Sequence, residues 1–275
     1  MDLKESPYPY FVKDELFNPQ VVADMKRNWP GPGYFSMEVP GNYCCGLDTI
    51  QGDGFWKNFL TQIFPQLAFN VLRAFSEWIE ARYPGEDQFY VSNYSLMQAE
   101  GNYGGHNVHN HHYHDPEWVA TMLVYLDASP GHEGTTVLKA KDGLDEAATA
   151  AQTLEWRDLT EEHETVAFKQ NRLFAFHDNP IAYHCVKPSK GKFGRRIFRA
   201  HLATNAAHVE RLYGVDYATY QKRRMEPTED PQVVEWMRRD IELLRNPVRM
   251  TEEEKGAWVM RKQLGLMPPR KLANE

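Results

Sequence analysis

Between residues 88 and 204 the chain is a series of short apolar segments, and their spacing constrains the fold more than any other feature. Gly, Pro, Asn and Asp separate the segments, which are rich in β-branched and aromatic residues, as is typical of strands. The segments are QFYVSNYSLM, VATMLVYLDA, GTTVLKA, ETVAF, RLFAF, AYHCVK and RIFRAHLA. The sequence therefore predicts an all-β middle region.

Helical patterns lie on both sides of this region. Asn18 suits a helix N-cap and Pro19 the first helical position, and residues 54–85 carry apolar residues three and four apart, with a break or kink at Pro65. Charged helices starting on N-cap residues are predicted after residue 205. We expect an α+β protein in which one domain, residues 1–204, has helical support over 15–85 and a β core over 88–204. Residues 205–275 would form a helical extension packed on this core or a separate helical module.

The composition restricts the partners. The chain of 275 residues has a net charge of -7, which argues against a surface that binds nucleic acid. Three cysteines form no CxxC pattern, which favours a reducing cytoplasm. No apolar run approaches the roughly 18 residues that a membrane span needs. We expect a cytoplasmic protein that binds a small molecule and neither nucleic acid nor a membrane.

Five of the eleven histidines lie between residues 106 and 114. On an extended strand residues i and i+2 face the same way, so His112 and His114 would share one face and point two imidazoles at one ion. A third ligand is available at His184, in the strand-like segment PIAYHCVKP. Such a facial site suits non-haem iron(II), with zinc as the main competitor.

Two stretches resemble a known family. YHDPEWVATMLVYLDASPGHEGTTVL and NRLFAFHDNPIAYHCVKPSKGKFGRRIFRAHL resemble the double-stranded β-helix of iron(II)/2-oxoglutarate-dependent oxygenases, particularly the prolyl-hydroxylase-like branch. In that family a distal His follows the first residue of an Asn/Asp-Arg-Leu strand by thirteen residues, as His184 follows Asn171 here. The resemblance covers residues 7 to about 204. It implies a jelly-roll core, Fe(II), 2-oxoglutarate and O2 as cofactors and co-substrates, and hydroxylation of an unactivated C–H bond of a small molecule or amino-acid-like substrate.

The sequence departs from this family at the His-x-Asp pair. If His112 is the first histidine, His114 stands where the family has an acid. We take the site to be formed by three histidines, His112, His114 and His184. Two other readings remain: a bulge could bring Asp115 to the metal, or His114 could swing away and leave an open position, as in the family's halogenases. Loss of the metal is a further alternative.

The resemblance also implies a basic residue, about ten positions after the distal histidine, that pairs with 2-oxoglutarate. Arg195 and Arg196 lie eleven and twelve positions after His184. Arg196 shares a strand face with Phe198, Ala200 and Leu202, a more core-like set than the face of Arg195, so Arg196 is favoured. Asn93 and Gln98 are further candidates for contacts with the co-substrate.

The remaining histidines are assigned lesser roles. His106, His109 and His111 are interpreted as loop or substrate-side residues, and His177 as a structural, hydrogen-bonded residue. A three-histidine iron oxygenase that does not use 2-oxoglutarate, an inactive barrel acting as a binding protein, and a zinc hydrolase are the alternative functions. An apolar stripe is available either for a homodimer or for packing on the barrel: Val233, Val234, Met237, Ile241 and Leu244.

Overall fold

The computed structural model describes residues 2–46, 54–99, 103–128, 133–152, 156–188, 195–225 and 230–266. Its strands are β1 (Asp2–Lys4), β2 (Tyr10–Lys13), β3 (Ser36–Val39), β4 (Asn42–Gly46), β5 (Gln88–Ala99), β6 (His106–His109), β7 (Trp118–Tyr125), β8 (Glu133–Ala140), β9 (Thr160–Ala167), β10 (Arg172–His177), β11 (His184–Val186), β12 (Arg195–Ala203) and β13 (Gln263–Leu266). The segments that the sequence assigned to strands between 88 and 204 thus overlap β5 and β7 to β12.

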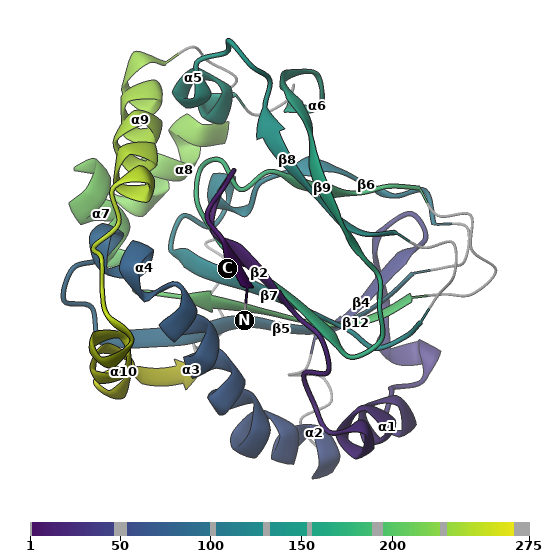
Figure 1. Cartoon of the computed structure of the whole chain (residues 1–275). Coiled ribbons are helices and arrows are strands. Elements are labelled where there is room, and N and C mark those ends of the chain that lie inside the picture. Colours follow the sequence, from purple (N-terminus) through teal and green to yellow (C-terminus); the bar gives the residue numbers. More distant parts are fainter. Residues whose placement is uncertain are drawn as a thin grey trace.

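The strands form two sheets that lie on opposite sides of a shared interior (Figure 1). The large sheet has the order β1-β2-β10-β7-β12-β5-β4-β3, with β13 also paired to β5. The small sheet has the order β6-β11-β8-β9. All pairings are antiparallel except that of β13 with β5. From β5 to β12 the chain crosses repeatedly between the two sheets, so the pairs β10-β7, β7-β12, β12-β5, β6-β11 and β11-β8 join strands that are not consecutive in sequence.

The helices cover the outer face of the large sheet and one end of the structure (Figure 1). They are α1 (Pro19–Arg27), α2 (Gly54–Asn58), α3 (Phe64–Ala74), α4 (Ser76–Arg82), α5 (Glu146–Ala151), α6 (Trp156–Leu159), α7 (Ala207–Tyr213), α8 (Tyr217–Met225), α9 (Pro231–Arg245) and α10 (Glu252–Met260). Short η1 (Pro32–Tyr34) and η4 (His111–Tyr113) turns and a π-helical segment, η3 (Phe59–Ile63), complete the described elements.

The predicted helix ends are largely confirmed. Asn18 caps α1 by accepting a hydrogen bond from the Gln20 backbone N–H at 2.9 Å, and Thr251 caps α10 within a capping box. Pro65, in contrast, does not break a helix. It lies in the first turn of α3, directly after the π-helical segment η3, so the helical run changes its type just before the proline, and the break falls at Phe75 instead.

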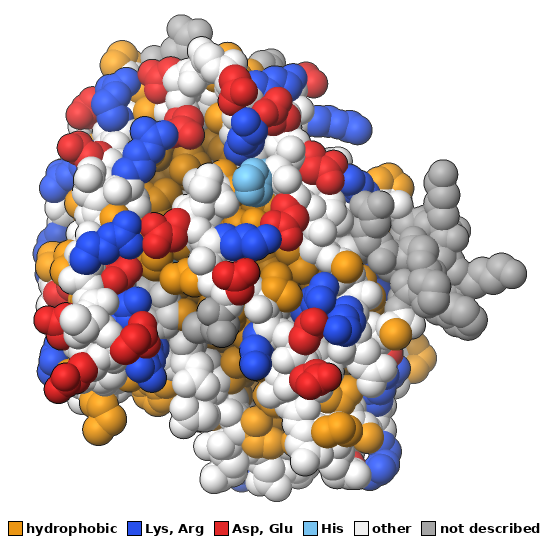
Figure 2. Space-filling model, viewed as in Figure 1, with side chains coloured by type: hydrophobic (Ala, Val, Ile, Leu, Met, Phe, Trp, Pro, Cys, Tyr) orange, Lys and Arg blue, Asp and Glu red, His pale blue; other side chains and the backbone are white. Residues whose placement is uncertain are grey.

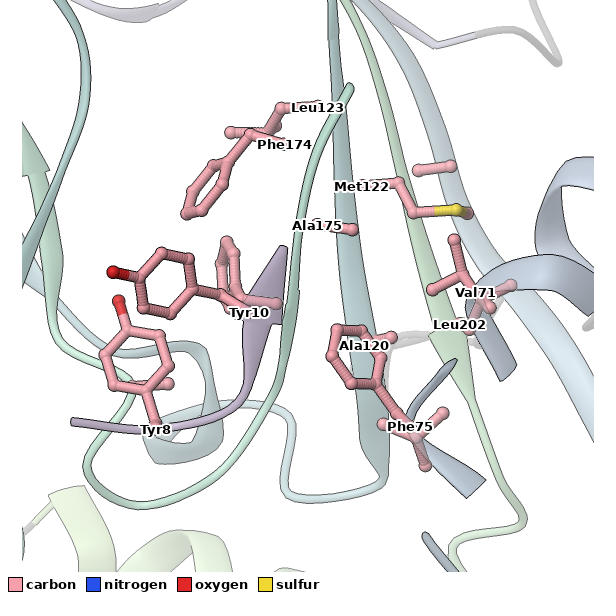
Figure 3. Packing of buried hydrophobic residues seen from close by; sticks show 14 of the residues in the cluster. Tyr8, Tyr10, Val71, Phe75, Ala120, Met122, Leu123, Phe174, Ala175 and Leu202 are labelled. Atoms are coloured by element: carbon pink, nitrogen blue, oxygen red, sulfur yellow. The ribbon is translucent and has the colours of Figure 1, made fainter. Parts of the chain in front are cut away.

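The large sheet has two buried faces, so the protein has two apolar layers (Figure 3). On the outer face Phe198 of β12 packs against Phe59 and Phe64, with ring centroids 5.2 and 5.6 Å apart. On the inner face Phe174 of β10 packs against Tyr10 of β2 at 6.0 Å. Alternate residues of each central strand therefore point either toward the helices or into the interior between the sheets.

The C-terminal segment packs on the rest of the chain in two ways. Helix α9 packs on α4 and α5, and the strand β13 pairs in parallel with Gln88–Val91 of β5. Four residues of the apolar stripe predicted on α9 are buried in this packing, since Val233, Met237, Ile241 and Leu244 are at most 9% exposed, and the fifth, Val234, is partly buried. The stripe thus packs within the chain.

The surface carries charges of both signs. On the face drawn in Figure 2, Lys and Arg side chains are interspersed with Asp and Glu. Within the described residues, no helix combines the length and the apolar character needed to span a bilayer.

Asn171 joins the N-terminal segment to the start of β10, and its replacement tests this junction. Its φ is 60°, and its side chain accepts from the Phe17 N–H at 3.0 Å and donates to the Phe17 carbonyl at 2.7 Å. Because Ala loses both bonds and tolerates positive φ poorly, Asn171→Ala is expected to lower the free energy of unfolding by roughly 2–4 kcal/mol. Asn171→Gly, the matched control, loses the same bonds without the backbone strain and should recover about 1 kcal/mol in urea unfolding. Equal stabilities of the two variants would contradict this account.

Candidate metal centre

Two histidines are brought to the same side by the extended residue between them. Strand β6 ends at His109 and the η4 turn begins at His111. Asn110, between them, has φ −146° and ψ 128°, which is extended backbone. Residues on either side of an extended residue point the same way, so both imidazoles face the end of the interior between the sheets.

The third histidine comes from the neighbouring strand. His184 of β11 lies directly opposite His109 in the antiparallel β6–β11 pair. One ring nitrogen from each of His109, His111 and His184 lies within 4.8 Å of the others. The ring centroids are 4.1 Å apart for His109 and His184, and 4.7 Å apart for His111 and His184. Three imidazoles therefore surround one point in space.

Hydrogen bonds fix which nitrogen of each ring faces this point. Nδ1 of His109 lies 2.8 Å from the Asn107 carbonyl oxygen, and Nδ1 of His184 lies 3.0 Å from the Ala182 carbonyl oxygen. Nδ1 of His111 lies 3.0 Å from Oδ1 of Asp178. Each Nδ1 carries the proton that its oxygen partner requires, which leaves the Nε2 lone pair of each ring free to bind a metal.

The same three rings are neutral at physiological pH. Burial lowers the pKa of His111 to about 3, with a further contribution from the charge of Arg199. Burial, then the neighbouring His111, lowers the pKa of His184 to about 3, and burial also holds the pKa of His109 well below its usual value. Neutral imidazole is the form that ligates metals.

A polar cluster lies directly behind His111. The Thr121 hydroxyl donates to Oδ2 of Asp178 at 2.7 Å, and Nδ1 of His201 donates to the same hydroxyl oxygen at 2.9 Å. The His201 ring stacks on Trp118 at 3.7 Å. Burial raises the pKa of Asp178 to about 7, against the opposing effect of the Thr121 hydrogen bond. His111, Asp178 and His201 also form a second group of close donor atoms.

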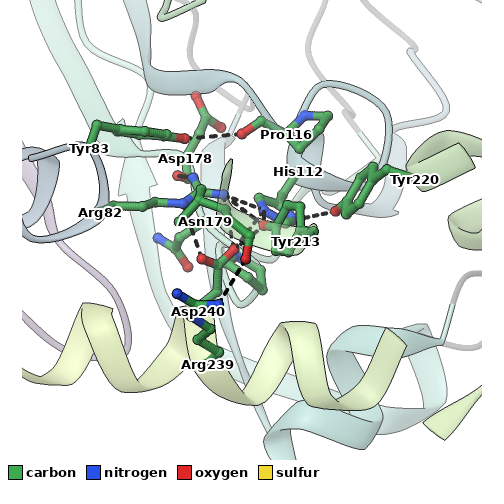
Figure 4. Close-up of polar contacts among 12 residues, drawn as sticks. Arg82, Tyr83, His112, Pro116, Asp178, Asn179, Tyr213, Tyr220, Arg239 and Asp240 are labelled. Atoms are coloured by element: carbon green, nitrogen blue, oxygen red, sulfur yellow. Dashed lines mark hydrogen bonds and ion pairs between the residues drawn. The ribbon is translucent and has the colours of Figure 1, made fainter. Parts of the chain in front are cut away.

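His112, which the sequence analysis assigned as a ligand, points elsewhere (Figure 4). Its Nε2 lies 2.6 Å from Nη2 of Arg82 and 3.1 Å from Oδ2 of Asp240. The assumption of an extended strand was wrong here, because Asn110 accepts from the His112 N–H at 2.8 Å and starts a helical turn. This turn rotates His112 away from His184 and into a buried ionic cluster.

His114 is likewise not brought to His184. It follows the η4 turn, its ring lies 4.1 Å from that of Tyr113, and its backbone carbonyl accepts from Nε2 of Gln221 at 3.0 Å. Asp115, the alternative acid ligand, is not grouped with the histidine triad within the part of the chain that the structure describes. His114 and Asp115 instead line a pocket beside the triad.

The two candidate arginines lie on opposite faces of β12, and Arg195, not Arg196, is on the face that points into the interior between the sheets. Arg196 faces the outer layer, where it forms a double ion pair with Asp127 at 2.8 and 3.0 Å. Arg195 is 4% exposed and lies over the Phe168 ring at 5.0 Å. Among the described residues no carboxylate lies within ion-pair distance of Arg195. The core-like face that favoured Arg196 packs on helices, not on the interior.

The two residues of β5 that were predicted to contact the co-substrate also lie on opposite faces of the sheet. Asn93 lies directly opposite His201 in the β5–β12 pair and so shares the inner face with it. Gln98 lies opposite Arg196 on the outer face, where its Oε1 accepts from the Trp29 indole N–H at 3.1 Å. Asn93 therefore stays a candidate for the interior, whereas Gln98 is engaged on the helix side.

A pocket of about 510 Å³ opens next to the triad. Its lining includes His109 and His111 and the aromatic residues Tyr113, Trp118 and Trp156. Asn107, His114, Asp115 and Arg157 contribute polar groups. A metal held by the triad would be reachable from this pocket.

Sequence reasoning missed His109, His111, Asp178 and His201 as members of the site. One signal was available: His109 and His111 form a His-x-His pair separated by a single residue, the same spacing as the chosen pair. An Asn before two histidines is also a helix-start signal that argues against extended backbone at His112. No local pattern identifies Asp178 or His201, because their place depends on strand pairing.

Comparison with known proteins finds no matching family model and no similar curated protein. Solved structures to which the chain is similar include a Pseudomonas putida prolyl-4-hydroxylase, at 14% identity and a TM-score of 0.49 over 71% of this chain and 92% of that chain. Another is the non-heme alpha-ketoglutarate-dependent carbocyclase SnoK of nogalamycin biosynthesis, at 10% identity and 0.47, over 71% of this chain and 79% of that one. A third is a 2OG-Fe(II) oxygenase family oxidoreductase from Burkholderia pseudomallei, at 10% identity and 0.41, over 70% and 84%. Similarity at this level leaves the function to be argued from the residues of the site.

The buried His177 gives a test of how the site region responds to acid. Burial lowers the pKa of His177 to about 3, and its Nδ1 lies 2.6 Å from the Val119 carbonyl oxygen. The unfolded chain, with a histidine pKa near 6.5, binds the extra proton between these values. The contribution of His177 to the free energy of unfolding is therefore fully present above about pH 6.5. It falls by up to about 1.4 kcal/mol per pH unit as the pH decreases toward 3.

The measurement is urea unfolding of the metal-free protein between about pH 7 and pH 5. His177→Gln should show a shallower pH dependence than the wild type, by up to one proton, whatever its absolute stability. If the free energies of unfolding of the wild type and His177→Gln changed in parallel with pH, the lowered pKa of His177 would be contradicted.

Proposed function

We propose that this protein is a non-haem iron(II)/2-oxoglutarate-dependent oxygenase that hydroxylates a small molecule at a three-histidine metal centre. The observation that carries the proposal is the triad itself: His109, His111 and His184 present three neutral imidazole nitrogens, within 4.8 Å of one another, beside a pocket. The two facing antiparallel sheets are consistent with the double-stranded β-helix of that family.

The residues present fit an iron(II) ion. Imidazole ligands on one side of the ion leave positions open for a co-substrate and O2, and each ligand is already oriented through Nδ1. When bound, iron with 2-oxoglutarate and O2 supplies the oxidising chemistry for hydroxylation of a C–H bond. The protein's own contribution is to hold the ligand nitrogens, to exclude bulk water and to place the substrate against the metal.

Arg195 is the proposed partner of 2-oxoglutarate. It is buried in the interior without a carboxylate partner among the described residues, and burial lowers its pKa. Two tyrosines, Tyr103 and Tyr125, interact with its charge, and the Tyr125 hydroxyl is fixed by Thr135 at 2.9 Å. A buried guanidinium without an acidic partner is costly unless an anion binds to it. A planar fork is well suited to the far carboxylate of the co-substrate.

The substrate would occupy the pocket next to the triad. The rings of Tyr113, Trp118 and Trp156 favour a flat, mainly apolar molecule, and a volume of about 510 Å³ is typical of a small-molecule site. Polar groups at its edge, His114 and Asp115 among them, would orient the substrate. In this arrangement His114 contacts the substrate and does not ligate the metal.

Metal titration tests the ligand set. The wild type is expected to bind one Co(II) or iron(II) ion per chain under anaerobic conditions, and His109→Ala or His184→Ala should weaken the binding on the order of 100-fold, because each removes one ligand. His114→Ala is the matched control and should retain the affinity. Loss of binding in His114→Ala with retention in His109→Ala would restore the set His112, His114 and His184.

Paired arginine variants test the co-substrate. Arg195→Leu should raise the dissociation constant for 2-oxoglutarate roughly 10- to 100-fold, because charge-assisted hydrogen bonds are lost. The neighbouring Arg196→Leu should leave it nearly unchanged and lower stability by about 1 kcal/mol or less, since its ion pair with Asp127 is partly exposed. The readout is the visible charge-transfer band of iron(II) with 2-oxoglutarate, titrated anaerobically. A wild type that binds iron but shows no such band would contradict the use of 2-oxoglutarate.

A further inference from the structure

One member of the triad differs from the others in its supporting hydrogen bond. The Nδ1 groups of His109 and His184 are bound by backbone carbonyl oxygens, whereas that of His111 is bound by the Asp178 carboxyl group at 3.0 Å. Asp178 is 0% exposed. A buried acid has therefore been placed directly behind one candidate ligand.

Hydrogen bonds to the backbone N–H and carbonyl groups of Asp178 hold this residue in position. Its N–H donates to the Val119 carbonyl at 3.1 Å, and its own carbonyl accepts from Nη1 of Arg82 at 3.4 Å. Its second carboxyl oxygen accepts from the Thr121 hydroxyl at 2.7 Å. Both oxygens of the side chain are thus engaged, and the Nδ1 group of His111 lies 3.0 Å both from Oδ1 of Asp178 and from the Thr121 hydroxyl oxygen.

We propose that Asp178 is a positioning residue of the metal centre, which supplies through His111 the negative charge that a set of three imidazoles lacks. A carboxylate that accepts the Nδ1–H of a ligating histidine fixes its tautomer and makes Nε2 a stronger donor to the metal. This inference rests on the proposed function, because it requires His111 to ligate the metal. It explains how a site can lack an acidic ligand and still offset the charge of a divalent ion.

The alternative is that Asp178 ligates a metal itself, together with His111 and His201. The hydrogen bonds argue against it. The Thr121 hydroxyl oxygen lies 2.7 Å from Asp178, 2.9 Å from His201 and 3.0 Å from His111. The Thr121 hydroxyl therefore lies at the centre of the second group and makes hydrogen bonds with all three of its members. These hydrogen bonds satisfy the polar groups without a metal ion.

The test compares two variants that disturb the same cluster. Asp178→Asn keeps the shape and removes the charge, whereas Thr121→Val removes a hydrogen bond and keeps the charge. Co(II) affinity is measured anaerobically by competition with a chelating indicator. Asp178→Asn should bind Co(II) 10- to 100-fold more weakly, in the range seen for partners of metal-binding histidines, and Thr121→Val should keep most of the affinity.

The outcomes separate this inference from the proposed function. If the wild type binds no metal, the proposed function fails. If the wild type binds Co(II) and Asp178→Asn binds it equally well, or if both variants lose affinity equally, the role of Asp178 is overturned while the metal site stands. Loss of far more than 100-fold in Asp178→Asn, with changed Co(II) absorption bands, would make Asp178 a ligand and overturn the inference as well.

A measurement on the wild type covers the case in which Asp178→Asn does not fold. In the zinc-loaded protein, nitrogen NMR shifts distinguish an imidazole Nδ1–H bound to a carboxylate from one bound to a peptide carbonyl. The Nδ1 shift of His111 should lie closer to that of an imidazolate than those of His109 and His184. Three equal shifts would overturn the inference.

Discussion

A buried ion pair fixes the turn that carries the histidines. Arg82, at the end of α4, binds Asp240 of α9 at 2.9 Å, and the two side chains are 4% and 1% exposed. His112 of η4 lies between them and the Tyr213 hydroxyl, which is 3.0 Å from its Nε2. Removing either charge would leave the other buried without a partner, which typically costs several kcal/mol. Four elements from distant parts of the chain therefore meet at the residue next to His111.

This arrangement explains why the sequence pointed to the histidine cluster and His184 but selected different histidines from those that the structure groups with His184. The cluster of histidines and the distal His184 were visible as a metal-binding pattern, and His184 does belong to the group. One turn at Asn110 decides which pair of histidines faces His184, His109 and His111 or His112 and His114. The partners that draw His112 away, Arg82 and Asp240, are far from it in sequence, so no local periodicity encodes them.

The same limit applies to the arginines of β12. Alternation along a strand separates two faces reliably, and it did separate Arg195 from Arg196. It cannot say which face lies inside when both are buried, because helices cover the outer face of this sheet and the small sheet lies over the inner one. The more apolar face belongs to the helix layer, and the interior that holds the candidate site is the more polar of the two. The strands β5 and β7 to β12 and the capped helices α1, α9 and α10, by contrast, followed from local patterns.

The pairing at the far edge of β5 has a consequence for where the folded unit ends. Strand β4 pairs with Ser95–Ala99 of β5, and β13 pairs with Gln88–Val91, so segments from opposite ends of the chain share one edge. An edge left bare presents a row of unsatisfied peptide groups to which another chain can add. Strand β13, formed by the last described residues, thus covers part of the edge of β5 to which another chain could pair. A version of the protein shortened before Gln263 would expose this part of the edge and favour aggregation, although every residue of the candidate metal centre would still be present.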